Sequence, residues 1–273
     1  MFKLGFPIWY GYGDRIRELA HEARITGFDY LEISLDYPWP FRGKTPLKDI
    51  VKIAEAEGLS IAFHAPWRDL RFSSPFEEVR MASLKVFERV VESIACYESD
   101  YLVLHLSSDQ AVDKIDEVRG EVVEAAIESV KALKEIASSH GLRLVIENVR
   151  EDLEMFMEIS SKADASICLD VGHAICLTAR RIGKEAIESE LAKWLERLGD
   201  RITVIHYSGI KFDGKWVRDH QPTDRSDKYL NLTKENIKTL KISNFLLEVF
   251  EGPENGDIRP SHLSDAVKFL REP

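Results

Sequence analysis

A carboxylate and an imidazole stand close together in residues 168–174, which read CLDVGHA. An apolar run that predicts a buried strand precedes them, so Asp170 and His173 should lie in the turn from this strand into a helix. Gly172 has no Cβ and lets the backbone approach another group closely. Taken alone, such an Asp could cap a helix while the His makes an ordinary surface hydrogen bond. The pattern gains weight because other apolar runs in the chain end in the same way.

The other apolar runs that end in a polar residue are spread along the whole chain. In order, these ends carry Glu32, His64, His105, Glu147, Asp170 with His173, His206 and Glu248, and the loop after the seventh run adds Asp219 and His220. Five of the eight histidines belong to this set. Buried carboxylates are unfavourable unless they are paired or bind a metal. Because Glu, Asp and neutral His are ligands of divalent cations, the set predicts a metal site if the fold brings its members together.

The elements that must position these residues alternate between strands and helices. Continuous Val/Ile/Leu runs predict strands at residues 3–8, 29–34, 60–64, 101–106, 143–148, 165–170, 202–208 and 244–250. Helical spacing of apolar residues predicts helices at 14–26, 45–57, 75–94, 117–140, 153–160, 171–198, 234–240 and 261–271. Gly27 should end the first helix. Thr45 and Ser74 should cap the second and third, with Glu77 completing a capping box.

Eight strands that alternate with eight helices indicate an α/β fold, the (β/α)8 TIM barrel, as a single domain over residues 1–273. Strands that are apolar throughout are typical of a parallel sheet covered on both faces. In a barrel the C-terminal ends of the strands converge on one face, which would make the polar residues neighbours. The alternative is an open doubly wound sheet, but residues 11–14 (GYGD) lack its GxGxxG phosphate loop.

Composition narrows the classes of function. The net charge of −10 argues against a generally basic nucleic-acid surface, although a local basic rim or a metal-rich cleft could still bind phosphate. No apolar run reaches the roughly 18 residues of a membrane-spanning helix, and the N-terminus has no signal-peptide pattern. The three cysteines show no CxxC spacing. We therefore expect a cytoplasmic protein without a membrane partner.

The strand-end motifs together resemble the endonuclease IV and xylose isomerase-like TIM-barrel superfamily, which includes D-tagatose 3-epimerase-like enzymes. The resemblance spans essentially the whole chain and rests on residues 146–148 (IEN), residues 168–174, His206 and the strand ending at Glu248. It implies a divalent metal (Zn, Mn, Co or Mg) bound by Glu147, Asp170, His206 and Glu248. It also implies that additional zinc ligands of the endonuclease IV branch match His64, His105, His173 and His220. We expect one ion, and up to three fit this pattern.

The chain departs from the nuclease branch in three places. That branch usually has Asp-x-His in the loop after the seventh strand, whereas residues 217–222 read VRDHQP. If His220 is aligned, Arg218 takes the acidic position and Asp219 is displaced by one residue, which leaves a third metal open. In addition, His105 is not followed by Pro-Gly, and Glu248 is not followed by Thr-Pro.

The first function that fits is isomerisation or epimerisation of a sugar or sugar phosphate. One ion would bind adjacent substrate oxygens and acidify the neighbouring C–H. Glu147 and Glu248 would exchange the proton as acid and base, and His173 would bind a substrate hydroxyl. His64 and His105 would then touch substrate or support the metal ligands. The acidic chain and the departures from the nuclease branch favour this function.

The second function is phosphodiester hydrolysis of the kind performed by an abasic-site endonuclease on DNA. Glu147 would bridge two metals, with His64 and His105 completing the first site. A third hypothesis, from another class, is a metal-stabilised barrel that binds a partner without catalysis.

Residues in the predicted loops are candidates for substrate contact under either enzymatic function. Trp39, Arg42, Trp67 and Arg68 follow the second and third strands, where they could wedge into DNA. We expect them instead to cover a small polar substrate. Glu32 and Lys211 complete the candidates, the latter in a long loop predicted over residues 209–232.

Overall fold

Eight parallel strands close into a barrel, in the order β1-β10-β7-β6-β5-β4-β3-β2. The computed structural model describes residues 2–106, 108–214, 216–252 and 256–273. The barrel strands are β1 (Lys3–Ile8), β2 (Tyr30–Ser34), β3 (Ser60–His64), β4 (Leu102–His105), β5 (Leu144–Glu147), β6 (Ser166–Asp170), β7 (Ile202–Tyr207) and β10 (Asn244–Leu247). The predicted TIM barrel is confirmed.

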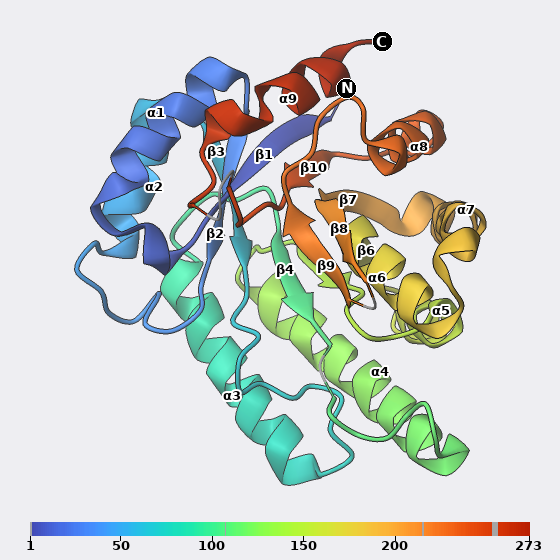
Figure 1. Ribbon diagram of the computed structural model, residues 1–273. Helices are drawn as coiled ribbons and strands as arrows, with labels where there is room; N and C mark the ends of the chain where they lie inside the picture. The colour runs from blue at the N-terminus through green and yellow to red at the C-terminus, as the bar shows by residue number, and fades with distance from the viewer. Residues whose placement is uncertain (1, 107, 215, 253–255) are drawn as a thin grey trace.

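Helices surround the ring of strands (Figure 1). They are α1 (Ile16–Thr26), α2 (Leu47–Ala56), α3 (Glu77–Ile94), α4 (Asp116–Ser139), α5 (Leu153–Lys162), α6 (Val171–Arg181), α7 (Ile187–Leu198), α8 (Lys228–Ile237) and α9 (Ser264–Arg271). Short 3-10 helices span Tyr10–Arg15, Lys184–Ala186, Gly199–Arg201 and Pro260–Leu263. An apolar core fills the space between strands and helices, which is why the strands are apolar on both faces. Within the described residues, no helix is long and apolar enough to cross a membrane.

The interior of the barrel is built in layers. A separate buried group at its centre comprises Tyr30, Ala62, Tyr101, Val103, Val145, Cys168, Val204 and Leu246. Because successive strand residues point to opposite faces, the residue two positions further along each strand faces the same interior. From seven of these eight positions, that residue is Glu32, His64, His105, Glu147, Asp170, His206 or Glu248. The polar residues therefore form one layer, at the C-terminal ends of the strands.

The segment after β7 differs from its prediction as a long loop. It contains an antiparallel hairpin of β8 (Gly209–Asp213) and β9 (Trp216–Gln221), and α8 starts at residue 228 rather than 234. Lys215 lies outside the described residues. The hairpin packs against α6 (Figure 1). Gly172 permits this approach, since a Cβ there would lie 2.7 Å from Ser208 Oγ and 3.2 Å from the Cβ of Asp219.

Two predicted helix caps are wrong. Extended backbone at Pro46 precedes α2, so Thr45 does not cap this helix. Helix α3 begins at Glu77 without a side-chain cap. The Oγ atom of Ser74 accepts a hydrogen bond from the backbone N–H of Phe76 at 3.2 Å, within the turn before the helix. Pro46 takes the N-cap position of α2, where its carbonyl accepts from the backbone N–H of Ile50, and Pro75 precedes Phe76, the N-cap residue of α3.

Glycines end two of the helical segments. Gly27 terminates α1 as predicted, with a φ of 105° in the left-handed region. The helix predicted over residues 171–198 is two helices, α6 and α7. Gly183 lies between them with a φ of 137°, which a helical residue does not adopt.

Candidate metal centre

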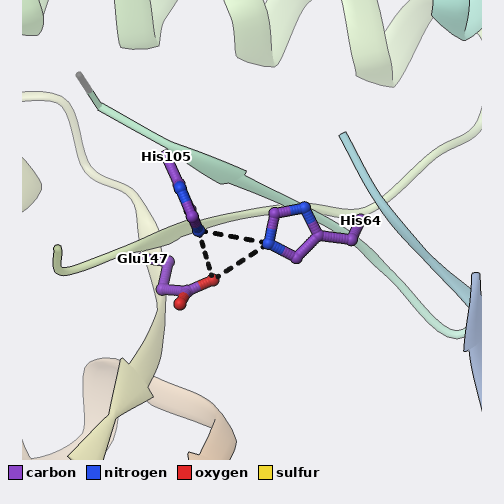
Figure 2. Close-up of side chains that lie close together, drawn as sticks. All are labelled: His64, His105 and Glu147. Atoms are coloured by element: carbon purple, nitrogen blue, oxygen red, sulfur yellow. Dashed lines mark hydrogen bonds and ion pairs between the residues drawn. The ribbon is translucent and has the colours of Figure 1, made fainter. Parts of the chain in front are cut away.

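The first cluster joins His64, His105 and Glu147 from the ends of three neighbouring strands (Figure 2). The two Nε2 atoms are 3.1 Å apart. The Oε2 atom of Glu147 lies 3.6 Å from His64 Nε2 and 3.4 Å from His105 Nε2. Ligand atoms around a tetrahedral zinc, with bonds of about 2.0–2.1 Å, are separated by roughly 3.3 Å. The three atoms therefore have the spacing of one face of such a site.

The second cluster joins Glu147, Asp170, His206 and Glu248, all buried, with one ligand atom of each within 4.8 Å of the others. His206 Nδ1 lies 3.2 Å from Glu248 Oε2 and 3.5 Å from Glu147 Oε2. Glu147 thus belongs to both clusters, and the same oxygen faces the imidazoles of each. The four residues predicted as metal ligands are neighbours in space.

The third cluster joins His173 on α6 with Asp219 and His220 on β9. The carboxylate oxygens of Asp219 lie 3.8 Å from His173 Nε2 and 4.0 Å from His220 Nε2. The one-residue displacement of Asp219 in the sequence therefore does not separate it from the two histidines. Adjacent residues of a regular strand point to opposite faces, yet Asp219 and His220 both face this cluster. The backbone of β9 departs from the extended conformation here, since His220 has a φ of 55°. These distances are wider than the 3.1–3.6 Å of the first cluster.

Backbone carbonyls fix the orientation of three of these rings. A ring whose Nδ1–H donates to a carbonyl presents the lone pair of Nε2 on its other side. The pairs are His64 with the carbonyl of Ala65 at 2.8 Å, His173 with that of Asn148 at 2.9 Å, and His220 with that of Glu248 at 3.0 Å. In each case Nε2 is the atom that faces its cluster.

Asn148 and Asp170 lock the ends of β5 and β6 together. The side chain of Asn148 donates to the carbonyl of Asp170 at 2.9 Å and accepts from its backbone N–H at 2.8 Å. One carboxylate oxygen of Asp170 caps α6 by accepting from the N–H of His173 at 2.5 Å. The role of Asn148 was not predicted, although it follows Glu147 directly. Asp170 is both a helix cap and a member of the second cluster, so the two interpretations of its motif are compatible.

Several buried polar atoms of the second cluster lack hydrogen-bond partners. Among the described residues, such atoms include both carboxylate oxygens of Glu147, Asp170 Oδ2, His206 Nδ1 and Glu248 Oε2. Buried polar groups are nearly always satisfied, and an unsatisfied one calls for an explanation such as a bound ion. Oxygen and imidazole nitrogen are the ligands of zinc and of other divalent metals. The residues at this site therefore fit a divalent cation.

Charges within the site shift the pKa values of its carboxyl groups in opposite directions. Burial favours the neutral acid, but His105 and His206 together hold the pKa of Glu147 well below its usual range. At Glu248, burial again favours the neutral acid, but His206 outweighs it and lowers the pKa to about 2. For Asp170 burial prevails and raises the pKa to about 7. Two of the three carboxyl groups are thus held as anions by neighbouring imidazoles.

Burial and the neighbouring carboxylates also shift the pKa values of the imidazoles. Burial would lower the pKa of His64, yet Glu147 raises it to about 9. The pKa of His173 also rises to about 9 against the effect of burial, because Asp170 and Glu147 are close. Burial prevails at His105 and lowers its pKa. Since metal ligation requires neutral imidazole, binding of a cation here would release protons.

Of the residues predicted to contact substrate, Trp67 and Arg68 lie at the mouth of the barrel. The exposed Trp67 ring is 5.9 Å from the ring of His105. The guanidinium of Arg68 lies over the Trp67 ring at 4.2 Å and pairs with Asp36. Lys211 is exposed on β8.

Trp39 and Glu32 are not on the surface, which corrects their assignment to substrate loops. Trp39 is only 1% exposed, and its indole N–H donates to the carbonyl of Thr45 at 3.1 Å, so it packs the loop rather than covering the site. Glu32 is buried inside the barrel, where its carboxylate contacts His206 and Tyr101.

Proteins of similar sequence include an uncharacterised protein and a probable endonuclease 4. An uncharacterised protein of Methanocaldococcus jannaschii is 28% identical over 198 residues, which cover 70% of this chain and 73% of the relative. A probable endonuclease 4 of Natranaerobius thermophilus is 25% identical over 272 residues, covering 93% and 92%. The match to the latter therefore extends over nearly the full length of both chains.

Solved structures share the fold at low sequence identity. D-psicose 3-epimerase of Clostridium cellulolyticum superposes with a TM-score of 0.68 at 16% identity, over 99% of this chain and 98% of that one. Endonuclease IV of Thermus thermophilus gives 0.62 at 20% identity, over 98% of each. The family model described as xylose isomerase-like TIM barrel matches residues 20–272. The chain belongs to the family of xylose isomerase-like TIM barrels.

Proposed function

We propose that this protein is a metal-dependent hydrolase that cleaves a phosphodiester. The carrying observation is the position of Glu147, whose Oε2 lies 3.4 Å from His105 Nε2 in the first cluster and 3.5 Å from His206 Nδ1 in the second. One carboxylate serving two adjacent ligand sets is the arrangement expected for a pair of ions. Isomerisation needs an ion only in the second cluster, so it does not account for the zinc-like spacing of the first. The geometry therefore favours the function that ranked second on the sequence alone.

The chemistry follows from what the two ligand sets would hold. Divalent ions bound by these residues would lower the pKa of water and neutralise charge that develops on a phosphoryl group. Glu147 fixes the distance between the two sets, and the carbonyl-bound ring of His64 presents a preset nitrogen to the first. The third cluster extends the row of ligands toward α6 and β9. Zinc fits the N/O ligand sets, and Mn, Co or Mg are alternatives to be tested.

Arginines at the mouth support an anionic substrate despite the net charge of −10. Arg150 and Arg180 line a cavity of about 180 Å³ together with His173 and Asp219 of the third cluster. Arg68 lies over Trp67 beside the first cluster. Arg68 and Arg150 also pair with Asp36 and Asp109, so the rim places guanidinium groups beside the acidic, metal-binding floor without a large net positive charge. Such a rim is suited to a phosphate whose charge the metals would share. Abasic DNA is one such substrate, suggested by the endonuclease relative.

The second candidate is the sugar or sugar-phosphate isomerase or epimerase. It is favoured by Glu147 and Glu248, which each have an unpartnered carboxylate oxygen close to His206 Nδ1, at 3.5 Å and 3.2 Å. Such a pair can remove and return a proton on two faces of a substrate carbon. In this case the first cluster would contact substrate rather than an ion.

The test is an assay on both substrate classes with the zinc-loaded and manganese-loaded protein. Bis(p-nitrophenyl) phosphate and abasic duplex DNA report hydrolysis, and a panel of ketoses and their phosphates reports isomerisation. We expect cleavage of a phosphodiester by the wild type, and cleavage at the buffer rate after Glu147→Gln. Glu22→Gln, a change of a buried carboxylate on the outer helix α1, serves as the control and should keep full activity. Turnover of a ketose with no phosphodiester cleavage would overturn the proposal.

A further inference from the structure

A chain of hydrogen bonds crosses the barrel interior directly beneath the second cluster. The Oε2 atom of Glu32 lies 3.1 Å from His206 Nε2 and accepts from the hydroxyl of Tyr101 at 2.6 Å. The hydroxyl of Tyr101 lies 3.1 Å from that of Tyr30. These four side chains are at most 3% exposed. Neither tyrosine belongs to the three clusters. The hydroxyl of Tyr101 contacts Glu32 directly, and that of Tyr30 contacts Tyr101.

The two ring nitrogens of His206 face different partners. Nε2 faces Glu32, whereas Nδ1 faces Glu147 and Glu248 and has no hydrogen-bond partner. A neutral imidazole carries one N–H and one lone pair. If Nε2–H donates to Glu32, the lone pair is on Nδ1 and points into the second cluster. The opposite tautomer would place two acceptors against each other at Glu32 and an N–H where a metal ligand is needed.

We propose that Glu32 is the positioning residue for His206, which it holds in the tautomer and orientation that bind metal through Nδ1. The negative charge of Glu32 also makes the imidazole a stronger ligand. This inference rests on the metal centre of the proposed function, but it holds for hydrolysis and isomerisation alike. It assigns to Glu32 a role beneath the metal, in place of the substrate contact expected from the sequence.

A glycine on β1, Gly5, leaves room for the Tyr30 ring. A Cβ on Gly5 would lie 2.1 Å from Cζ of Tyr30, so the absence of a side chain lets the Tyr30 ring lie across the barrel. The ring then supports Tyr101, which supports Glu32. Both hydrogen bonds to Glu32 end on the same oxygen, Oε2. A glutamine can therefore reproduce both through its amide oxygen while removing the charge.

The experiment measures zinc affinity at His206 itself in the full-length protein. Protein with 15N-labelled histidine rings is stripped of metal and titrated with zinc in a chelating buffer, and ring spectra report zinc binding and which nitrogen carries the proton. The variants are Glu32→Leu, Glu32→Gln and Tyr101→Phe. Glu22→Leu is the matched control, because Glu22 is a buried carboxylate bonded to Arg259 and Ser261, remote from the barrel interior.

We expect Glu32→Leu to weaken zinc binding at His206 by roughly 10–100-fold, as for other groups that orient a ligand. Its ring spectrum should lose the single Nε2–H form. Glu32→Gln and Tyr101→Phe should keep that form and bind zinc less tightly by a smaller factor, which preserves the test if the leucine variant fails to fold. Glu22→Leu should bind zinc like the wild type.

Two results would contradict the role of Glu32, and they have different consequences for the proposed function. If the wild type binds zinc at His206 and every Glu32 variant binds it equally, with Nε2 still protonated, then the inference about Glu32 is wrong and the proposed function stands. If the wild type binds no zinc at His206, then the proposed metal centre fails, and the role of Glu32 fails with it.

Discussion

The two ends of the barrel differ in how their carboxylates are paired. At the N-terminal end, Asp100 accepts from Lys3 at 2.7 Å, from Ser60 at 2.9 Å and from Asn244 at 3.2 Å, which ties β1, β3 and β10 to the residues before β4. At the C-terminal end, the carboxylates of Glu147, Asp170 and Glu248 crowd together with oxygens left unpartnered. Asp100 therefore has its oxygens paired, whereas these oxygens at the C-terminal end have no hydrogen-bond partner among the described residues.

This contrast indicates which end is organised for stability and which for ligand binding. A paired carboxylate near the surface supports the fold, whereas a buried one without a partner opposes folding unless something binds it. Functional sites are where such unfavourable arrangements are retained. Substitutions at the two ends should consequently separate stability from metal binding.

The largest effect is expected from Glu147→Gln. Glutamine keeps the shape of the side chain but removes the charge shared by the first and second clusters, so both should lose affinity for metal together. We expect hydrolysis at the buffer rate and at least two metal equivalents fewer per chain by elemental analysis. If the variant keeps its full metal content, Glu147 is not a ligand.

Replacing His64 and His105 together with Ala should remove one metal equivalent and leave the second cluster loaded. The first cluster would keep only Glu147, and phosphodiester cleavage should fall to background because one of the two ions is missing. The sequence alone led to the expectation that metal content would not change. Unchanged metal content would agree with that expectation instead and would favour the isomerase function.

At the opposite end, Asp100→Ala should lower the free energy of unfolding by about 1–3 kcal/mol, because it removes the shared acceptor of three hydrogen bonds. Lys3 is nearly half exposed, so its ion pair adds little to this value. Metal content should match the wild type. Urea denaturation measures the first quantity and elemental analysis the second. A loss of metal in this variant would contradict the claim that the N-terminal end affects stability and not metal binding.

A further effect concerns pH in the metal-free protein. Burial raises the pKa of Asp170 from its usual 3.8 to about 7, so the folded state binds this proton more tightly than the unfolded state. The contribution of this group to stability is therefore full below about pH 4 and is lost as the pH rises to about 7. Asp170→Asn keeps the cap on α6 and removes this dependence.

Urea denaturation of both proteins with a chelator, at pH 4 and at pH 7, tests this prediction. The stability of Asp170→Asn relative to the wild type should increase between the two values. An equal difference at both pH values would show that Asp170 is not held neutral by burial.

The barrel could be predicted because each strand is a short apolar run that ends in a polar residue, and strand ends converge in this fold. Glu147, Asp170, His206 and Glu248 were found for this reason. The third cluster was left open, because only the hairpin of β8 and β9 brings Asp219 beside His173. Its signal was the alternation of Ile210 and Phe212 before an Asp-Gly turn, which was hidden among charged residues.

Burial was the property that the sequence predicted least well. Trp39 stands between two prolines in a loop, where an exposed ring was expected, yet it is packed inside that loop. Glu32 ends an apolar run like the metal-binding candidates, and only the distances separate its position beneath the centre from theirs. A strand-end pattern identifies the layer to which a residue belongs, but partners within that layer depend on side-chain geometry.

Anomalous X-ray diffraction at the zinc absorption edge, from crystals of the zinc-loaded protein, tests the central claim most directly. We expect two anomalous peaks on either side of the Glu147 carboxylate, one beside His64 and His105 and the other among Asp170, His206 and Glu248. A single peak within the second cluster, with water or substrate beside His64 and His105 at full zinc saturation, would contradict this claim.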